Sequence, residues 1–128
     1  MAIGLIPRIT HLDFNDAIDE LRRRIAVLFR NLFDINTIVV TASKTASRAE
    51  NVLLCNATSG SLTITLPDAL LVKESTIVVK KTDASVNTVT IDGFGAQTID
   101  GAATVVLSTQ YHFRVIISDG LNWHIIGS

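Results

Sequence analysis

The sequence predicts a mainly β protein, in which an N-terminal arm and an amphipathic coiled-coil helix precede a small antiparallel β-sandwich or barrel, assembled as a homotrimer. Two observations lead to this fold class. The chain has 128 residues, enough for one modest domain and an extension. Up to about residue 34 the apolar residues follow a helical period, and beyond it a period near 2 rich in Val, Ile and Thr. We therefore expect an arm (1–12), a trimerising helix (13–34) and a β domain (35–128).

The helix is expected from a heptad seam. Its large apolar residues follow one another at steps of 4, 3, 4, 3 and 4: Phe14, Ile18, Leu21, Ile25, Leu28 and Leu32. Heptad position a then holds Ile18, Ile25 and Leu32, and this spacing is suited to a coiled coil. Asp13 is the expected N-cap. These six residues are the predicted trimer interface.

A second reading of this helix stays open, because an amphipathic helix can also cover a sheet of its own chain. Further apolar residues make the apolar surface of the helix wider than a two-helix coiled coil needs, and this favours a coiled coil of three helices. They are Ala17, Ala26, Val27, Phe29 and Phe33. Two and a half heptads are marginal alone, so the β domain must help to hold the assembly.

Strands are expected wherever apolar and polar residues alternate after residue 34. The ranges are 35–41, 52–56, 61–66, 76–81, 88–91, 113–118 and 123–126, and we count about eight short strands in all. Residues 42–50 are expected to form a loop. Hairpins are predicted around residues 57–60, 83–87 and 119–122, the last containing Asp-Gly. Leu62, Ile64 and Leu66 should share one face.

A four-residue sequence repeat occurs at two predicted corners. Thr-Ile-Asp-Gly at residues 90–93 recurs at residues 98–101. We expect equivalent strand-to-turn corners, in which Asp92 and Asp100 accept local backbone hydrogen bonds and each following glycine supplies a positive φ. Two copies do not make a solenoid.

Composition excludes several classes of protein. The net charge is −1 with 18% charged and 5% aromatic residues, which argues against a polybasic nucleic-acid binder and against a stacking platform. A single cysteine, Cys55, rules out an intramolecular disulfide. No targeting segment or membrane-spanning stretch is expected, so we predict a product made in a cytoplasm, with no nucleic-acid or membrane partner.

No residue pattern indicates catalysis, and we predict no enzyme activity, no cofactor and no metal site within one chain. His11, His112 and His124 lack metal-ligand spacing. A ring of identical histidines on a threefold axis stays open. Cys55 lies among apolar neighbours and reads as a buried hydrophobe. Asp92 and Asp100 are better explained by their turns than as paired acids.

Two aromatic residues of the β half are candidate glycan contacts, because one exposed ring can stack on a sugar. They are Trp123 and Tyr111, and Phe94 could contribute to the same site. The competing interpretation is that Trp123, directly after a hairpin loop, covers the end of a small β core.

The β half resembles the β domains of bacteriophage head fibres, capsid decoration proteins and tail fibres. The resemblance rests on residues 56–67, 86–93, 97–101 and 118–123, and covers roughly residues 51–127. It implies a homotrimeric, non-enzymatic structural protein of a phage virion, made in the host cytoplasm, and it identifies the kind of particle better than the place on it. No long shaft precedes the β domain, which favours a capsid decoration (cement) or short head-fibre protein over a tail fibre.

The resemblance also implies partners. We expect the major capsid protein or another virion protein to be bound through an apolar docking arm: Ile3, Leu5, Ile6, Pro7 and Ile9. The arm could equally reach a neighbouring subunit or fold back on its own domain. The alternative function is a tail-fibre or tail-tip module that binds a host receptor or surface glycan.

Overall fold

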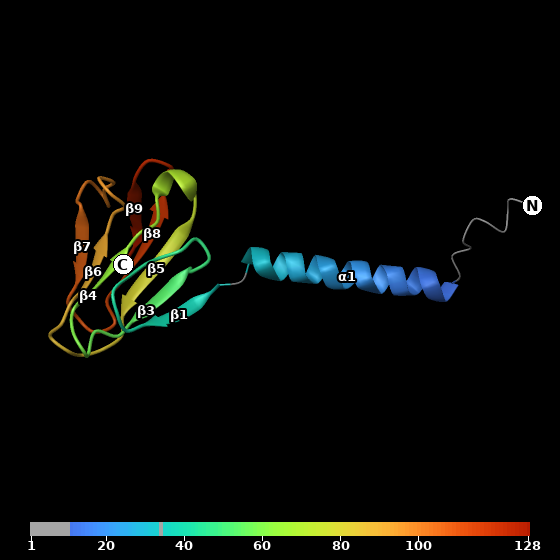
Figure 1. Ribbon diagram of the computed structural model, residues 1–128, viewed down its shortest axis with the longest axis horizontal. Coiled ribbons are helices and arrows are strands. Elements are labelled where there is room, and N and C mark those ends of the chain that lie inside the picture. The colour runs from blue at the N-terminus through green and yellow to red at the C-terminus, as the bar shows by residue number, and fades with distance from the viewer. Residues whose placement is uncertain (1–10, 34) are drawn as a thin grey trace, which may run out of the picture. The chain divides into compact units, whose positions relative to one another are not determined.

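The computed structural model describes residues 11–33 and 35–128, with side chains for 14–28 and 35–128 (Figure 1). The chain divides into two compact units, residues 1–34 and 35–128. Within the described residues the first unit holds one helix, α1 (His11–Phe33), and the second holds nine strands. The prediction of a mainly β chain with one N-terminal helix is confirmed.

Helix α1 begins earlier than its sequence signal predicts. Residues 11 and 12 are already helical, so Asp13 lies inside the first turn and its prediction as the N-cap is wrong. The side chains of Asp13 and Leu32 lie outside the described part, as does the whole of residues 1–10 with the predicted docking arm.

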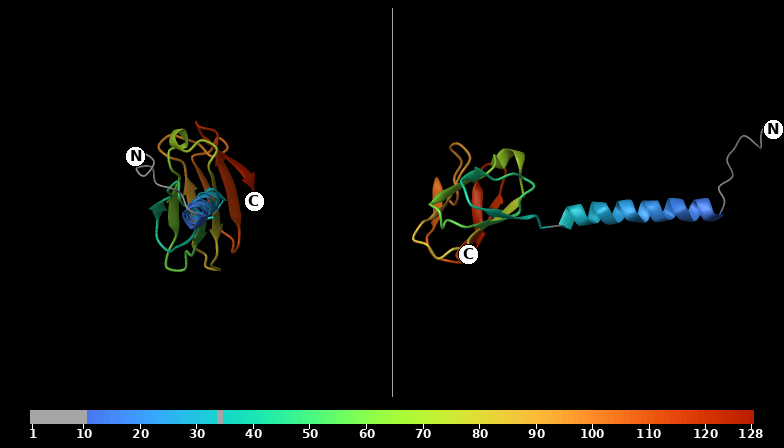
Figure 2. Two further views of the ribbon diagram at one scale, coloured as in Figure 1. Left: turned by 90° about the vertical axis from the view of Figure 1, so that its right-hand side faces the viewer. Right: turned by 60° about the horizontal axis from the view of Figure 1, so that its bottom comes forward.

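The β unit is a sandwich of two mixed sheets. The five-stranded sheet has the order β1-β3-β5-β8-β9 and the four-stranded sheet the order β2-β4-β6-β7. The left view of Figure 2 looks across the larger sheet from β1 in teal to β9 in dark red. Bounds in the larger sheet are β1 Thr37–Val40, β3 Val52–Cys55, β5 Thr76–Lys81, β8 Phe113–Ser118 and β9 Trp123–Gly127. In the smaller sheet they are β2 Lys44–Thr45, β4 Leu62–Thr65, β6 Val89–Asp92 and β7 Thr104–Leu107.

The first six strands alternate between the two sheets, as in the coils of a parallel β-solenoid. Strands β1, β3 and β5 pair in parallel in one sheet, and β2, β4 and β6 pair in parallel in the other. Strands β7, β8 and β9 then add antiparallel pairs. The predicted all-antiparallel sandwich is therefore wrong in its topology, and the barrel alternative is wrong because each sheet order has two free edges.

Two predicted hairpins are corners between sheets. The connection at residues 57–60 takes the chain from β3 to β4, and the one at 83–87 takes it from β5 to β6. These corners lie on each other: Asp83 Oδ1 accepts the N–H of Ala57 at 2.7 Å, and Asn87 Nδ2 donates to the carbonyl of Ala57 at 2.8 Å. These contacts satisfy backbone groups that a ladder would otherwise use, and so favour stacked coils over hairpins.

The third hairpin is confirmed. Strands β8 and β9 pair around residues 119–122, with Ile117 opposite His124. Asp119 fixes the turn, because its Oδ1 accepts the N–H groups of Leu121 and Asn122, each at 2.8 Å. The loop expected at residues 42–50 contains the short strand β2, and β7 had no predicted strand.

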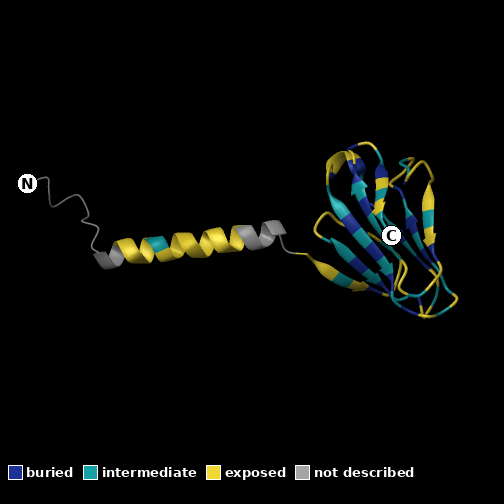
Figure 3. Ribbon diagram, turned by 180° about the vertical axis from the view of Figure 1, so that it is seen from behind, coloured by how far each residue is buried: buried dark blue, intermediate teal, exposed yellow. Residues whose placement is uncertain are grey.

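The core lies between the two sheets. Leu62, Ile64 and Leu66 are buried as the alternation predicts, while Thr63 and Thr65 point outward. Figure 3 shows buried and partly exposed residues alternating along the strands. Stacking in register extends the core from coil to coil, with Leu53 beside Val79. Each inward position thus acquires an apolar neighbour from the next coil.

The echoed corners are not equivalent. Gly101 has a φ of +83° and follows Asp100, itself left-handed at +49°. Gly93 is needed for a different reason, because a Cβ atom there would lie 2.1 Å from the carbonyl oxygen of Gln97. Asp100 accepts from a distant backbone group, the N–H of Ile125 at 3.1 Å. The sequence repeat therefore reflects two different local constraints.

Candidate functional site

The seam of α1 exposes its apolar side chains. Leu21 is 53% exposed and Leu28 66%, while Ile18 is partly exposed. Phe14 and Ile25 are also exposed, so five of the six predicted interface residues lie within the described side chains and form one stripe. A row of exposed large apolar residues at heptad spacing is the arrangement from which coiled coils assemble.

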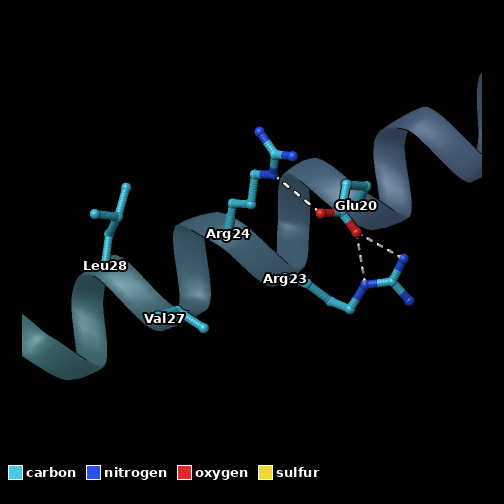
Figure 4. A pocket seen from close by; sticks show the side chains of 5 residues that line it. All are labelled: Glu20, Arg23, Arg24, Val27 and Leu28. Atoms are coloured by element: carbon cyan, nitrogen blue, oxygen red, sulfur yellow. Dashed lines mark hydrogen bonds and ion pairs between the residues drawn. The ribbon is translucent and has the colours of Figure 1, made fainter.

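Charged side chains beside this seam are paired within the same helix. Glu20 binds Arg23 and Arg24 through contacts of 3.0 Å (Figure 4). Asp19 binds Arg22 at 3.3 Å. Hydrogen bonds from Arg24 and then Arg23 lower the pKa of Glu20. Exposed pairs of this kind add little stability. They pair the three arginines with acids of the same helix, and of these arginines Arg22 and Arg24 flank the seam.

A shallow hollow lies where β8 begins. It is lined by Tyr111, His112, Phe113, Arg114 and Ser128. Tyr111 is 60% exposed and has a φ of +66°, which is unusual for a bulky residue. Lys80 Nζ lies 5.4 Å from the centre of the Tyr111 ring. Tyr111 is therefore accessible, as a glycan contact must be.

Trp123 is not accessible. Its side chain is fully buried in the core, so the expectation that it contacts a glycan is wrong in this structure. The competing interpretation, a tryptophan that covers the β core, agrees with its position. The ring nitrogen Nε1 has no hydrogen-bond partner among the described atoms.

His124 lies between two carboxylates at the surface. Its Nε2 is 2.7 Å from Asp119 Oδ2, and its Nδ1 is 3.7 Å from Asp100 Oδ1. Hydrogen bonds from the N–H groups of Asn122 and Leu121, followed by the contact with His124, lower the pKa of Asp119 to about 2. These groups fix the β8–β9 turn. His112 is also exposed, and His11 lies outside the described side chains.

A buried ion pair is the feature that sequence reasoning missed. Lys81 Nζ lies 2.6 Å from Asp83 Oδ2, and both side chains are buried. Burial alone would raise the pKa of Asp83, but hydrogen bonds from Lys81, Ser85 and Ala57 bring it well below its usual range. The signal was present, because the alternation through Ile77 and Val79 places position 81 inward.

Cys55 is buried beside this pair. Burial, with a smaller contribution from the charge of Asp83, raises the pKa of its thiol to about 12. A thiol with this pKa is not an activated nucleophile, and the expected buried, structural cysteine is confirmed.

Among the described residues, no group of three or more His, Cys, Asp or Glu side chains is placed to hold a metal ion. Nor does the described part contain a helix long and apolar enough to cross a membrane. The chain matches no model of a known protein family, and no curated protein matches it.

Proposed function

We propose that this protein is a non-enzymatic structural protein of a bacteriophage virion, a homotrimer that decorates the capsid or forms a short head fibre. The observation that carries the proposal is the exposed seam of α1. The resemblance of the β half to phage appendage domains supports its location. The protein acts by association: a ligand that prefers the assembled shell shifts the equilibrium towards it.

The seam supplies the free energy of self-association. Burying one large apolar side chain is worth about 1.5–3 kcal/mol before entropy is subtracted. Five exposed or partly exposed seam residues within the described side chains therefore offer enough to hold helices together. A single helix of this length has only marginal stability in water, so folding and assembly of α1 are one process.

Charge favours parallel helices. In a fully overlapped antiparallel pair, the heptad register brings Arg24 against Arg24 and Arg22 against Arg22 of the second helix. Parallel helices avoid these like-charge contacts, since the same register places Arg22 near Ala17 of the neighbour. A closed threefold assembly also requires parallel helices.

The number of helices follows from the width of the apolar surface. Ile at position a with Leu at position d would by itself favour a coiled coil of two helices. Ala17 and Phe29, at the positions flanking the seam, add apolar surface that a third helix covers. We therefore propose a trimer, in which each helix contacts two neighbours.

The seam is tested by Leu21→Asp, which places a carboxylate in the centre of the interface. We expect sedimentation to show a trimer for the parent chain and a monomer for this variant. Arg23→Asp is the matched control, because Arg23 lies at heptad position f, on the side of α1 farthest from the seam, and its side chain is 71% exposed, so the trimer should stay intact. A Leu21→Asp variant that sediments as a trimer contradicts the seam.

Capsid binding is tested by pelleting with bare capsid shells. The full-length trimer should sediment with the shells, and a variant without residues 1–12 should stay in the supernatant. If the full-length trimer itself stays in the supernatant, the capsid location is wrong and the tail location is favoured.

The alternative function, binding of a host glycan by a tail module, is favoured by one observation: the exposed, strained Tyr111 with Lys80 over its ring. A glycan array should then show binding that Tyr111→Ala abolishes. Leu121→Ala is the control, because Leu121 is 70% exposed and does not line the hollow. An array without signal for the parent trimer counts against this function.

A further inference from the structure

The two sheets of the sandwich have different outer faces. On the five-stranded sheet, the outward positions of the inner strands β3, β5 and β8 carry six partly exposed apolar side chains: Val52, Leu54, Val78, Phe113, Val115 and Ile117. The edge strands add Val39, 72% exposed, and Ile126, 60% exposed. We call these eight residues the outer apolar face.

The register makes the outer apolar face continuous. Val52, Val78 and Val115 lie side by side on three neighbouring strands, and Leu54 lies beside Val39. Adjacent strands are about 4.8 Å apart, so these side chains are direct neighbours across the sheet. A contiguous apolar patch of this kind on a protein surface marks an interaction site.

The opposite face of the sandwich serves as an internal reference. Outward positions of the four-stranded sheet carry mainly threonine, with one acid and one valine: Thr45, Thr63, Thr65, Thr90, Asp92, Thr104 and Val106. This is the pattern of a sheet that faces water. The two outer faces of the sandwich therefore differ in polarity: the four-stranded sheet presents mainly polar side chains, and the five-stranded sheet presents mainly apolar ones.

We propose that the outer apolar face packs against the same face of neighbouring copies in the assembly. This inference rests on the proposed self-association and adds a second interface to it, independent of where the protein sits on a virion. Its occupant is a second copy of this chain.

Charge fits a second copy. Outward positions of the five strands carry no acidic residue, and their basic groups are already engaged: Lys80 lies over Tyr111, and His124 contacts Asp119. Two identical faces can therefore meet without burying an unpaired carboxylate, which would be costly.

Connectivity also fits a second copy. The face includes strand β1, whose first residue, Thr37, follows the last helical residue, Phe33, by four positions. A chain segment of this length spans at most about 14 Å. When α1 helices assemble in parallel, the β1 strands of neighbouring copies are tethered close together, at an effective concentration on the order of millimolar. At this effective concentration, weak apolar contacts between the faces are sufficient to hold them together.

The test measures whether the face is covered. Val78→Cys places a thiol on the middle strand of the outer apolar face, and Thr90→Cys places one at the matched outward position on the four-stranded sheet. Both positions are partly exposed in one protomer. Cys55 does not compete for a maleimide, since it is fully buried and burial raises its thiol pKa to about 12. Each variant is labelled in the full-length assembly and in the Leu21→Asp background.

We expect Val78→Cys to react at least about tenfold more slowly in the assembly than in the unassembled background, because covered thiols react only through local opening. Thr90→Cys should react equally in both. Equal rates for Val78→Cys in both states overturn the inference and leave the helical seam standing. Protection of Val78→Cys that appears only after capsid shells are added also overturns it, since the occupant is then a different protein.

Sedimentation of the same samples separates this inference from the proposed function. If Leu21→Asp remains assembled, the seam is wrong, and the comparison is made by diluting the protein about 1,000-fold instead. Protection of Val78→Cys that is lost when dilution dissociates the assembly then supports the inference, and protection that persists in the dissociated protomer overturns it. A parent chain that is monomeric at every concentration overturns both.

Discussion

Helix α1 and the β unit differ in how far their large apolar side chains are buried. In the β unit the largest apolar side chains lie between the sheets, with Trp123, Leu53 and Ile64 fully buried. In α1 the apolar side chains at heptad positions are exposed, as at Leu28 with 66%. The β unit thus has an apolar core of its own, whereas the described side chains of α1 have none. Substitutions in the two units should therefore give different dependences on protein concentration.

The largest effect is expected in the β unit, from Lys81→Met. The substitution leaves Asp83 as a buried carboxylate without its cation, and breaking a buried ion pair from one side costs about 3–5 kcal/mol. Denaturant unfolding followed by the fluorescence of Trp123, the single tryptophan, measures it. Lys80→Met is the control, because Lys80 points outward on the same strand. Equal effects of the two variants would contradict the assigned role of the pair.

A core truncation, Ile64→Ala, should come next. Ile64 is fully buried and lies in register with Ile91, so its removal leaves a cavity and lowers the free energy of unfolding by about 2–5 kcal/mol. The loss should be the same at all protein concentrations. Thr65→Ala, on the outward side of the same strand, should cost far less. A concentration-dependent effect of Ile64→Ala would show that the β unit is not stable by itself.

Leu21→Ala should produce the reverse pattern. It removes about 1.5–3 kcal/mol of burial per helix from the proposed assembly. Far-ultraviolet circular dichroism should show helix content falling on dilution, while Trp123 fluorescence reports an unchanged β unit. If the β unit unfolds together with α1, the two units are not independent and the comparison fails.

The smallest effect concerns Asp119 and pH. Because folding lowers its pKa from 3.8 to about 2, the Asp119 carboxylate stabilises the β8–β9 turn above pH 3.8, and this contribution is lost as the pH falls towards about 2. Unfolding midpoints measured down this range should fall less steeply in Asp119→Asn than in the parent chain. His124→Ala should change the profile less, because two backbone N–H groups contribute more than His124 to the low pKa.

The sequence predicts which residues of a strand face the core, because alternation is a local property. This is why the prediction that Leu62, Ile64 and Leu66 share one face of their strand was correct. It does not predict strand partners, since those depend on where the chain goes after each strand. A four-residue polar connection is equally compatible with a hairpin and with a corner between sheets. Here the hydrogen bonds of Asp83 and Asn87 to Ala57 select the corner.

The candidate surfaces were predicted unevenly for similar reasons. The heptad seam is visible in a single helix, so its residues could be named from the sequence. The outer apolar face could not be, because it combines residues from five strands. Its signal is nevertheless present as unbroken apolar runs at residues 77–79 and 115–117, which indicate strands apolar on both faces. Of the two candidate glycan contacts, Tyr111 is exposed and Trp123 is buried. The sequence does not distinguish them, since the burial of Trp123 depends on the whole sandwich.

The winding of the first six strands has a consequence for folding during synthesis. Strand β5, in the middle of the larger sheet, has β3 as its neighbour from the start but gains β8 only after more than thirty further residues. Until then its free edge and the inner side of the sheet stay open to other strands, a state prone to mispairing. Trp123 of β9, the largest fully buried side chain, closes the core after that. A nascent chain can therefore complete the sandwich only when β9 emerges from the ribosome, and α1 is available for assembly well before.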